Sequence, residues 1–226
     1  MVPMQLRHEI KHEITYADML VLRQRLSAIM KHDGHTNGGV YEIRSLYFDN
    51  IYDKALREKL DGVSVREKYR IRLYNHDTSF IRLERKRKIG GLGYKESAIL
   101  TQQQAEAIAK SDTAWMAKSD NEVIRGFYAR IKNEGLSPKV IVDYTREPFV
   151  FHAGNVRVTL DYDIRTGMRC TDFLNPASVS IPIENSPSIL EVKWDNFLPD
   201  IIRDALQLDC RRNGAFSKYA ACRMYD

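Results

Sequence analysis

Charged and apolar residues alternate along several extended segments of the chain, and this alternation is the strongest constraint on its fold. In residues 64–74 every second position is basic: Arg66, Lys68, Arg70 and Arg72. The positions between them are mostly apolar, with Glu67 as the exception: Val65, Tyr69, Ile71 and Leu73. Because successive side chains of a strand point to opposite faces, this period of two predicts a strand with one charged and one apolar face.

The same period recurs in four further segments: residues 5–14, 79–88, 155–165 and 189–194. Residues 64–74 and 79–88 are separated only by Asn75-His76-Asp77-Thr78, a spacing that predicts a β-hairpin. Strands and helices do not alternate strictly, which argues against a doubly wound parallel sheet or a TIM barrel. About eight strands with hairpin connections predict an antiparallel sheet, and eight strands can close into a barrel.

Three predicted amphipathic helices can cover the apolar face of that sheet. Thr15 is the expected N-cap of a helix over residues 17–30, and Thr101 begins a second helix. A third helix is expected over residues 121–133 and ends before Gly135. We therefore expect an α+β fold in which one domain, residues 1–226, forms a closed antiparallel eight-stranded β-barrel. Its flanking helices would leave a polar, cation-lined lumen.

The net charge of +5 is concentrated in one part of the chain. Residues 64–97 hold ten cations and four acids, a surplus of six, so the remaining residues sum to −1. A solvated outer face on each strand is the simpler interpretation. The number and length of the charged rows favour a lumen instead, and an empty lumen of like charges is unfavourable unless a polyanion enters it. Tyr69 and Tyr162 lie on the opposite face from the cations, which disfavours single-stranded nucleic acid.

Other classes of protein are excluded by simple patterns. No apolar run approaches the roughly 20 residues that span a bilayer, and the first residues lack the apolar core of a signal peptide. The three cysteines, Cys170, Cys210 and Cys222, form no CxxC pair, so neither a zinc site nor a disulfide framework is indicated. We expect a cytoplasmic protein with reduced thiols.

Several motifs, in order along the chain, resemble those of a known family: RHEIKHEI, IRSLYFDNIYDKAL, REKYRIRLY, IRLERKRK, YTREPF, NVRVTLDYDIR, ILEVKWD and FSKY. They are similar to the triphosphate tunnel metalloenzymes of the CYTH-like superfamily, and within it to the VTC domain of polyphosphate polymerases. One motif departs from the superfamily, whose hydrolase and cyclase branches carry Glu-x-Glu-x-Lys on the first strand. Here the pattern is Arg7-x-Glu9-x-Lys11, which exchanges a carboxylate for a cation and favours the polymerase-like branch.

The resemblance implies roles for individual residues. The phosphate contacts of a catalytic tunnel would be Lys11, Arg70, Arg72, Lys86, Arg146 and Arg157. Further substrate contacts would come from Arg7, Lys88, Lys95, Lys193, Ser217 and Lys218. Carboxylates for Mn²⁺ or Mg²⁺ would be Glu191, Glu9 and Glu84. The assignments that rest on strand parity more than on a motif are those of Arg7, Glu9, Lys88, Lys95 and Asp161.

The function implied is the transfer of the γ-phosphate of ATP onto a growing polyphosphate chain. A phosphoryl-transfer site needs positioning and charge neutralisation more than covalent chemistry, which suits rows of cations. Two alternatives stay open. One is a hydrolase of tripolyphosphate or organic triphosphates, and the other is a non-catalytic polyphosphate-binding module. The expected partners are ATP or another triphosphate and inorganic polyphosphate, with no nucleic acid and no membrane span; no protein partner is assigned.

Overall fold

The structure is a computed structural model that describes residues 7–90, 92–208, 214 and 216–225. The chain divides into two compact units. Unit 1 comprises Met1–Glu42, Tyr144–Ile164 and Glu184–Ser217; unit 2 comprises Ile43–Asp143, Arg165–Ile183 and Lys218–Asp226. The sequence interpretation of one domain over residues 1–226 stays a prediction.

Eight main strands form one sheet: β1 (His8–Ile14), β3 (Tyr41–Asp49), β4 (Val65–Tyr74), β5 (Asp77–Ile89), β6 (Leu92–Leu100), β7 (Ser137–Phe151), β8 (Val156–Thr166) and β10 (Ser188–Trp194). Two short strands extend it: β2 (Lys31–His32) pairs with β7, and β9 (Ile181–Pro182) pairs with β8. The strand order is β1-β10-β8-β7-β3-β4-β5-β6. The ladders β1–β10, β10–β8, β3–β4, β4–β5 and β5–β6 are antiparallel, as predicted.

The predicted closure of this sheet into a barrel is not observed. Within the described part of the chain the strand order begins at β1 and ends at β6, and no ladder joins these two strands. Counting eight strands could not settle this point. Closure also requires a strand tilt and a register stagger that fit each other, and neither follows from the number of strands.

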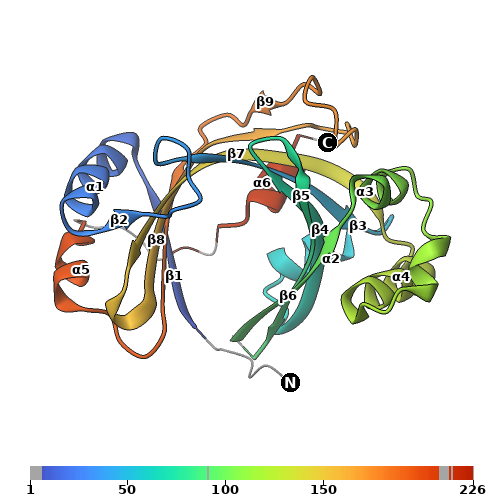
Figure 1. The fold of residues 1–226 in the computed structure, drawn as a ribbon, viewed down its shortest axis with the longest axis horizontal. Coiled ribbons are helices and arrows are strands. Elements are labelled where there is room, and N and C mark those ends of the chain that lie inside the picture. Colours follow the sequence, from blue (N-terminus) through green and yellow to red (C-terminus); the bar gives the residue numbers. More distant parts are fainter. Residues whose placement is uncertain (1–6, 91, 209–213, 215, 226) are drawn as a thin grey trace. The chain divides into compact units, whose positions relative to one another are not determined.

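Unit 2 contains the predicted hairpin of β4 and β5. Its loop is the dipeptide Asn75–His76, whose φ angles of 49° and 55° match a two-residue turn with both central residues left-handed. The apolar face of β4–β6 packs on α3 (Gln102–Ala109) and α4 (Glu122–Glu134), as Figure 1 shows. Side chains central to this core are Tyr69, Ile71, Leu83 and Phe127, all with exposed fractions of 1% or less.

Unit 1 is built in the same way. Helices α1 (Tyr16–Ile29) and α5 (Asp200–Ala205) pack on the apolar face of β8 and β10 (Figure 1). Leu22 and Leu26 of α1 meet Val158 and Val192 of these strands in one buried cluster. In both units, therefore, helices cover the apolar strand face, and the charged face lies on the other side of the strands.

The predicted helix ends are confirmed by their hydrogen bonds. Thr15 forms a capping box with Asp18 at the start of α1, and Thr101 forms one with Gln104 at the start of α3. Gly135 ends α4 in the left-handed conformation, with φ of 69°, which glycine adopts without steric cost. The remaining helices are α2 (Lys54–Leu60) and α6 (Lys218–Arg223), with 3₁₀ turns at Ala114–Lys118 and Ala153–Asn155.

Glu67, the exception to the alternation of β4, is paired on the apolar side of the hairpin. It accepts hydrogen bonds from Arg85 Nε and Nη2 at 2.9 and 2.7 Å, and Arg130 Nε of α4 lies 2.6 Å away. This carboxylate therefore joins strand and helix through ion pairs. A cavity of about 180 Å³ adjoins it, lined by residues of β3, α2, β4, β5 and α4 that include Phe48 and Tyr69.

No helix among the described residues combines the length and apolar composition needed to cross a bilayer. Cys170 and Cys222 carry thiols that are not joined in a disulfide, and Cys210 lies outside the described residues.

Candidate functional site

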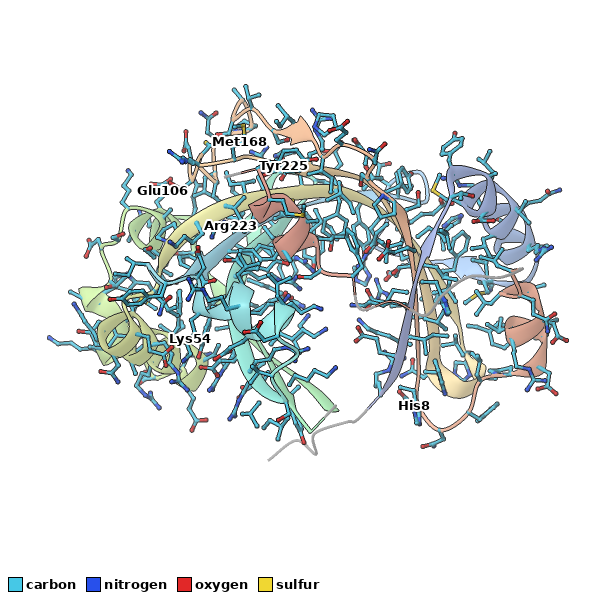
Figure 2. The ribbon with its side chains drawn as sticks, turned by 180° about the vertical axis from the view of Figure 1, so that it is seen from behind. His8, Lys54, Glu106, Met168, Arg223 and Tyr225 are labelled. Carbon is cyan, nitrogen blue, oxygen red and sulfur yellow. The ribbon has the colours of Figure 1, made fainter. Side chains whose placement is uncertain are left out.

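The charged face of unit 2 is organised by the register of β4, β5 and β6. Residues paired across an antiparallel ladder project from the same face. The pairs that do so here are Arg66↔Lys88, Lys68↔Lys86, Arg70↔Glu84 and Lys86↔Lys95. The structure thus brings five of the predicted cations to one face: Arg70, Arg72, Lys86, Lys88 and Lys95. In Figure 2 the strands of this hairpin carry side chains on the face turned away from α4.

Glu84 is the shared counter-ion of this face. Its side chain is only 1% exposed, and Arg70 donates to it from Nε at 2.7 Å. Lys95 Nζ lies 2.7 Å from its other oxygen, and Arg72 Nη1 lies 3.9 Å away. Burial by itself raises the pKa of Glu84, but the charges of Arg70, Arg72 and Lys95 outweigh it and hold the pKa well below its ordinary value. Glu84 therefore stays ionised and holds these cations in place. The sequence predicted it as a metal carboxylate, but its side chain already contacts three positive side chains.

Two hydroxyl side chains of β3 complete this face, and neither was predicted from the sequence. Ser45 Oγ accepts a hydrogen bond from Arg72 Nε at 3.0 Å, and the Tyr47 hydroxyl accepts one from Arg70 Nη1 at 2.8 Å. Both are registered opposite the arginine that they contact. The sequence offered one signal for them: Ser45 and Tyr47 are two positions apart and therefore share a face of their strand. That strand is otherwise largely apolar, so the signal was weak.

On unit 1, carboxylates and ammonium groups of β1 and β10 alternate. Lys11 is registered opposite Glu191, and Glu9 opposite Lys193. Lys11 Nζ lies 2.7 Å from Glu9 Oε1 and 3.8 Å from Glu191 Oε2, and Lys193 Nζ contacts the same two carboxylates. Burial lowers the pKa of Lys11, but the charges of Glu191 and Glu9 outweigh it and raise the pKa above its ordinary value.

Arg146 of β7 joins this group through a bidentate pair. Its Nε and Nη2 donate to the two oxygens of Asp161 at 2.6 and 2.7 Å, and Asp161 is fully buried. Arg146 Nη2 also lies 3.6 Å from Glu191 Oε2. Burial by itself lowers the pKa of Arg146, but the charge of Asp161 outweighs it and raises this pKa well above its ordinary value. The guanidinium is therefore permanently charged. Asp161, which was assigned from strand parity alone, is thus the partner that orients Arg146, a predicted phosphate contact.

Arg157 of β8 lies opposite Lys193 in the register but turns to other partners. Its Nη2 is 2.8 Å from Asp33 Oδ2 and donates to the Tyr41 hydroxyl at 2.8 Å. Asp33 lies in the loop after β2, and no sequence pattern connected it with β8. Directly before β1, Arg7 Nε pairs with Asp195 at 2.7 Å. Lys218 is the first residue of α6, and Ser217 directly precedes it.

Two of the three predicted metal carboxylates, Glu9 and Glu191, lie together on unit 1. Glu9 and Glu191 share Lys11 and Lys193 as partners on unit 1, whereas Glu84 belongs to unit 2. Within the described ranges no three His, Cys, Asp or Glu side chains form a group that could hold a metal ion. Mg²⁺ in phosphate-transfer sites is commonly bound by one or two carboxylates together with substrate phosphates. Glu9 and Glu191 fit such a metal, provided that it arrives with phosphate oxygens as its other ligands.

Comparisons with known proteins identify a family and a similar fold. The chain matches a family model described as the VTC domain over residues 6–225. No curated protein sequence matches it. A candidate adenylate cyclase from Bacillus halodurans has a similar structure, with 13% sequence identity and a TM-score of 0.51 over 84% of this chain and 80% of that chain. The PH1819 protein from Pyrococcus horikoshii OT3 is 12% identical, with a TM-score of 0.44 over 88% and 84%. At these identities the likeness to the first structure concerns the fold alone.

Proposed function

The chain belongs to the VTC domain family, and on that premise we propose that it binds the phosphate chain of a nucleoside triphosphate or of polyphosphate on its cation-rich strand faces. The observation that carries this proposal is that the guanidinium groups of Arg70, Arg146 and Arg157 are each already held by a carboxylate. Arg70 is held by Glu84 and Tyr47, Arg146 by Asp161, and Arg157 by Asp33. Such pairing orients the remaining N–H donors before an anion arrives, which lowers the entropy lost on binding.

The reaction that we propose is transfer of the γ-phosphoryl group of ATP to the terminal oxygen of a polyphosphate chain. The P–O bond to the β-phosphate breaks, ADP leaves, and a new P–O–P bond forms. Arg70, Arg72, Arg146 and Arg157 would hold non-bridging oxygens, and Lys11 and Lys86 would neutralise the chain. The attacking phosphate oxygen is already ionised, so no strong general base is required. The other proposed contacts are Arg7, Lys88, Lys95, Lys193, Ser217 and Lys218.

Glu191 and Glu9 are the proposed carboxylates for Mn²⁺ or Mg²⁺. When bound there with phosphate, the ion would add positive charge that stabilises the developing charge of the transferred group. Glu84 is not proposed for this role, because Arg70 and Lys95 hold its two oxygens at 2.7 Å. At Glu191 Oε2, by contrast, Lys11 and Arg146 lie 3.8 and 3.6 Å away. The family resemblance implies a tunnel that is closed on all sides. That closure stays a prediction, because the strand order of the described residues is open.

Product analysis tests the reaction. Purified protein incubated with ATP and Mn²⁺, with and without a short polyphosphate primer, is expected to form long-chain polyphosphate and one ADP for each phosphate added. Gel electrophoresis measures the polymer, and nucleotide chromatography measures ADP. Release of orthophosphate from tripolyphosphate without chain growth would instead support the hydrolase. Tight polyphosphate binding with no turnover under varied metals and primers would support the binding module.

Replacing Glu191 by glutamine tests the metal assignment. We expect Mn²⁺ affinity in the presence of tripolyphosphate to fall at least about tenfold, because a charged ligand is lost. Tripolyphosphate binding without metal should stay equal or become tighter, because one negative charge is removed from the face. Calorimetry of both titrations measures the two effects separately. Glu13→Gln, an exposed carboxylate on β1, is the matched control; equal Mn²⁺ affinity in Glu191→Gln and Glu13→Gln would refute the assignment.

A further inference from the structure

Tyr47 occupies a central position on the charged face of unit 2. It lies on β3 opposite Arg70 of β4, and its side chain is only 3% exposed. Its hydroxyl oxygen accepts a hydrogen bond from Arg70 Nη1 at 2.8 Å, while Arg70 Nε donates to Glu84 at 2.7 Å. The guanidinium of Arg70 is therefore held from two neighbouring strands at once.

Two cations of β4 and an aromatic ring of α6 lie close to the ring of Tyr47. Lys68 Nζ and the Arg70 guanidinium carbon lie 5.5 and 5.7 Å from its ring centroid. The ring of Tyr219 stacks on it with a centroid distance of 5.0 Å. Tyr219 in turn donates a hydrogen bond to the fully buried Asp49 at 2.7 Å. The C-terminal helix thus prevents Tyr47 from turning away from Arg70.

We propose that Tyr47 is a positioning residue for Arg70, and that its hydroxyl acts as a counter-charge that a bound phosphate group replaces. The second half rests on the proposed function, because it requires a phosphate ligand on this face. A neutral phenol orients Arg70 without reducing the positive charge of the face. A phenolate neutralises one cation and competes with an incoming anion.

The charges that face Tyr47 decide which form is present. Burial raises the pKa of this phenol, but Arg70, Lys68 and Arg72 of β4 outweigh it and lower the pKa to about 7. The other ionisable groups around it are Glu84 of β5, which reaches it through Arg70, Tyr219 of α6 and Asp49 of its own strand. A bound phosphate adds negative charge beside the phenol and raises its pKa again. Binding above about pH 7 therefore takes up a proton, and phosphate affinity falls as the pH rises.

A spectroscopic titration tests the counter-charge without reference to any ligand. The chain has 12 tyrosines, and phenolates absorb in the near ultraviolet where phenols do not. We expect the wild-type protein to form one phenolate with a midpoint near the pKa of about 7, and Tyr47→Phe to lack this step. Added tripolyphosphate should move the midpoint to higher pH. A step that is absent from the wild type, or that persists in Tyr47→Phe, would overturn the counter-charge.

Binding measurements test the positioning role. Tyr47→Phe keeps the ring that stacks on Tyr219 and loses only the hydroxyl. At about pH 6, where Tyr47 is neutral, it should bind tripolyphosphate about 3- to 10-fold more weakly than wild type, because a hydrogen bond to a charged group is lost. The ratio of wild-type to Tyr47→Phe affinity should fall about tenfold between about pH 6 and about pH 8, because about pH 8 lies one unit above the pKa of about 7. Using the ratio cancels the titration of tripolyphosphate itself.

The control is Tyr128→Phe, on α4, for which the affinity ratio to wild type should be near one at both pH values. A ratio of wild-type to Tyr47→Phe affinity that stays at one across this range would refute both roles of Tyr47. A ratio that differs from one but does not change with pH would refute the counter-charge. If the wild-type protein bound no tripolyphosphate at all, the proposed function and the replacement by phosphate would both fail. The absorbance titration would still decide whether Tyr47 carries charge beside Arg70.

Discussion

Glu84→Gln is expected to destabilise the folded protein by about 3–5 kcal/mol, the cost of breaking a buried ion pair by removing one partner. The carboxylate is 1% exposed, and the side chains of Arg70 and Arg72 are 17% and 5% exposed. Without Glu84 these guanidinium groups lose the charge that compensates their desolvation and repel each other. Lys95 adds less, because its side chain is 47% exposed and solvent screens it.

Urea unfolding at neutral pH measures this loss. Glu96→Gln on the neighbouring strand is the control, since Glu96 is 44% exposed and pairs with Arg85 only at 3.6 Å. It should change the free energy of unfolding by less than about 1 kcal/mol. A Glu84→Gln protein as stable as this control would contradict the assignment of Glu84 as the shared counter-ion.

The pH dependence of the same comparison has a definite sign. The pKa of Glu84 is lower in the folded than in the unfolded protein, so its stabilising contribution is fully present above its ordinary value of 4.5. It is lost as the pH falls below that value. The difference in free energy of unfolding between wild type and Glu84→Gln should therefore be constant from neutral pH to about pH 5 and shrink in stronger acid.

Tripolyphosphate should raise the melting temperature of Glu84→Gln more than that of wild type, because the ligand supplies the missing negative charge.

Disrupting the Arg146–Asp161 pair is the second change with a large expected effect. Arg146→Gln leaves a fully buried carboxylate without its bidentate partner, and Asp161→Asn leaves a guanidinium that is 14% exposed. Each should cost about 3–5 kcal/mol of folding stability. The double variant removes both charges, so its loss should be smaller than the sum of the single losses by up to about 3 kcal/mol.

Ligand affinity should not follow this recovery of stability. If Arg146 holds a phosphate oxygen, both Arg146→Gln and the double variant should bind tripolyphosphate about 10- to 100-fold more weakly, the value of a charge-assisted hydrogen bond. Isothermal calorimetry on the folded proteins measures this affinity. The control is Asp163→Asn, which changes an exposed carboxylate on β8, the strand of Asp161. Wild-type affinity in the double variant would make Arg146 a purely structural residue.

Much of the local structure could be predicted because it depends on neighbouring residues. The period of two in β4 and β5 fixed which side chains share a face, and Asn75–His76 can adopt the left-handed turn of the hairpin. Thr15, Thr101 and Gly135 mark helix ends through hydrogen bonds that span only a few residues. The helices cover the apolar face in each unit because no other surface buries it.

The partners of the charged residues could not be predicted in this way. Glu84 looked like one carboxylate in a basic row, and only the register of three strands placed Arg70, Arg72 and Lys95 around it. The contact of Arg157 with Asp33 joins residues more than 100 positions apart. Alternation defines the face of a strand but contains no information about which strand lies beside it or at what offset.

The sequence by itself therefore determined that this protein has strands with charged rows on one face and helices on the other, and its motifs indicated the VTC family. The tertiary structure decided which carboxylate or hydroxyl holds Arg70, Arg146 and Arg157. It also showed an open strand order where a closed barrel was expected. The physical reason is the range of the interactions. Side-chain alternation and helix capping act between near neighbours, whereas ion pairing and sheet closure depend on strand register and tilt between distant segments.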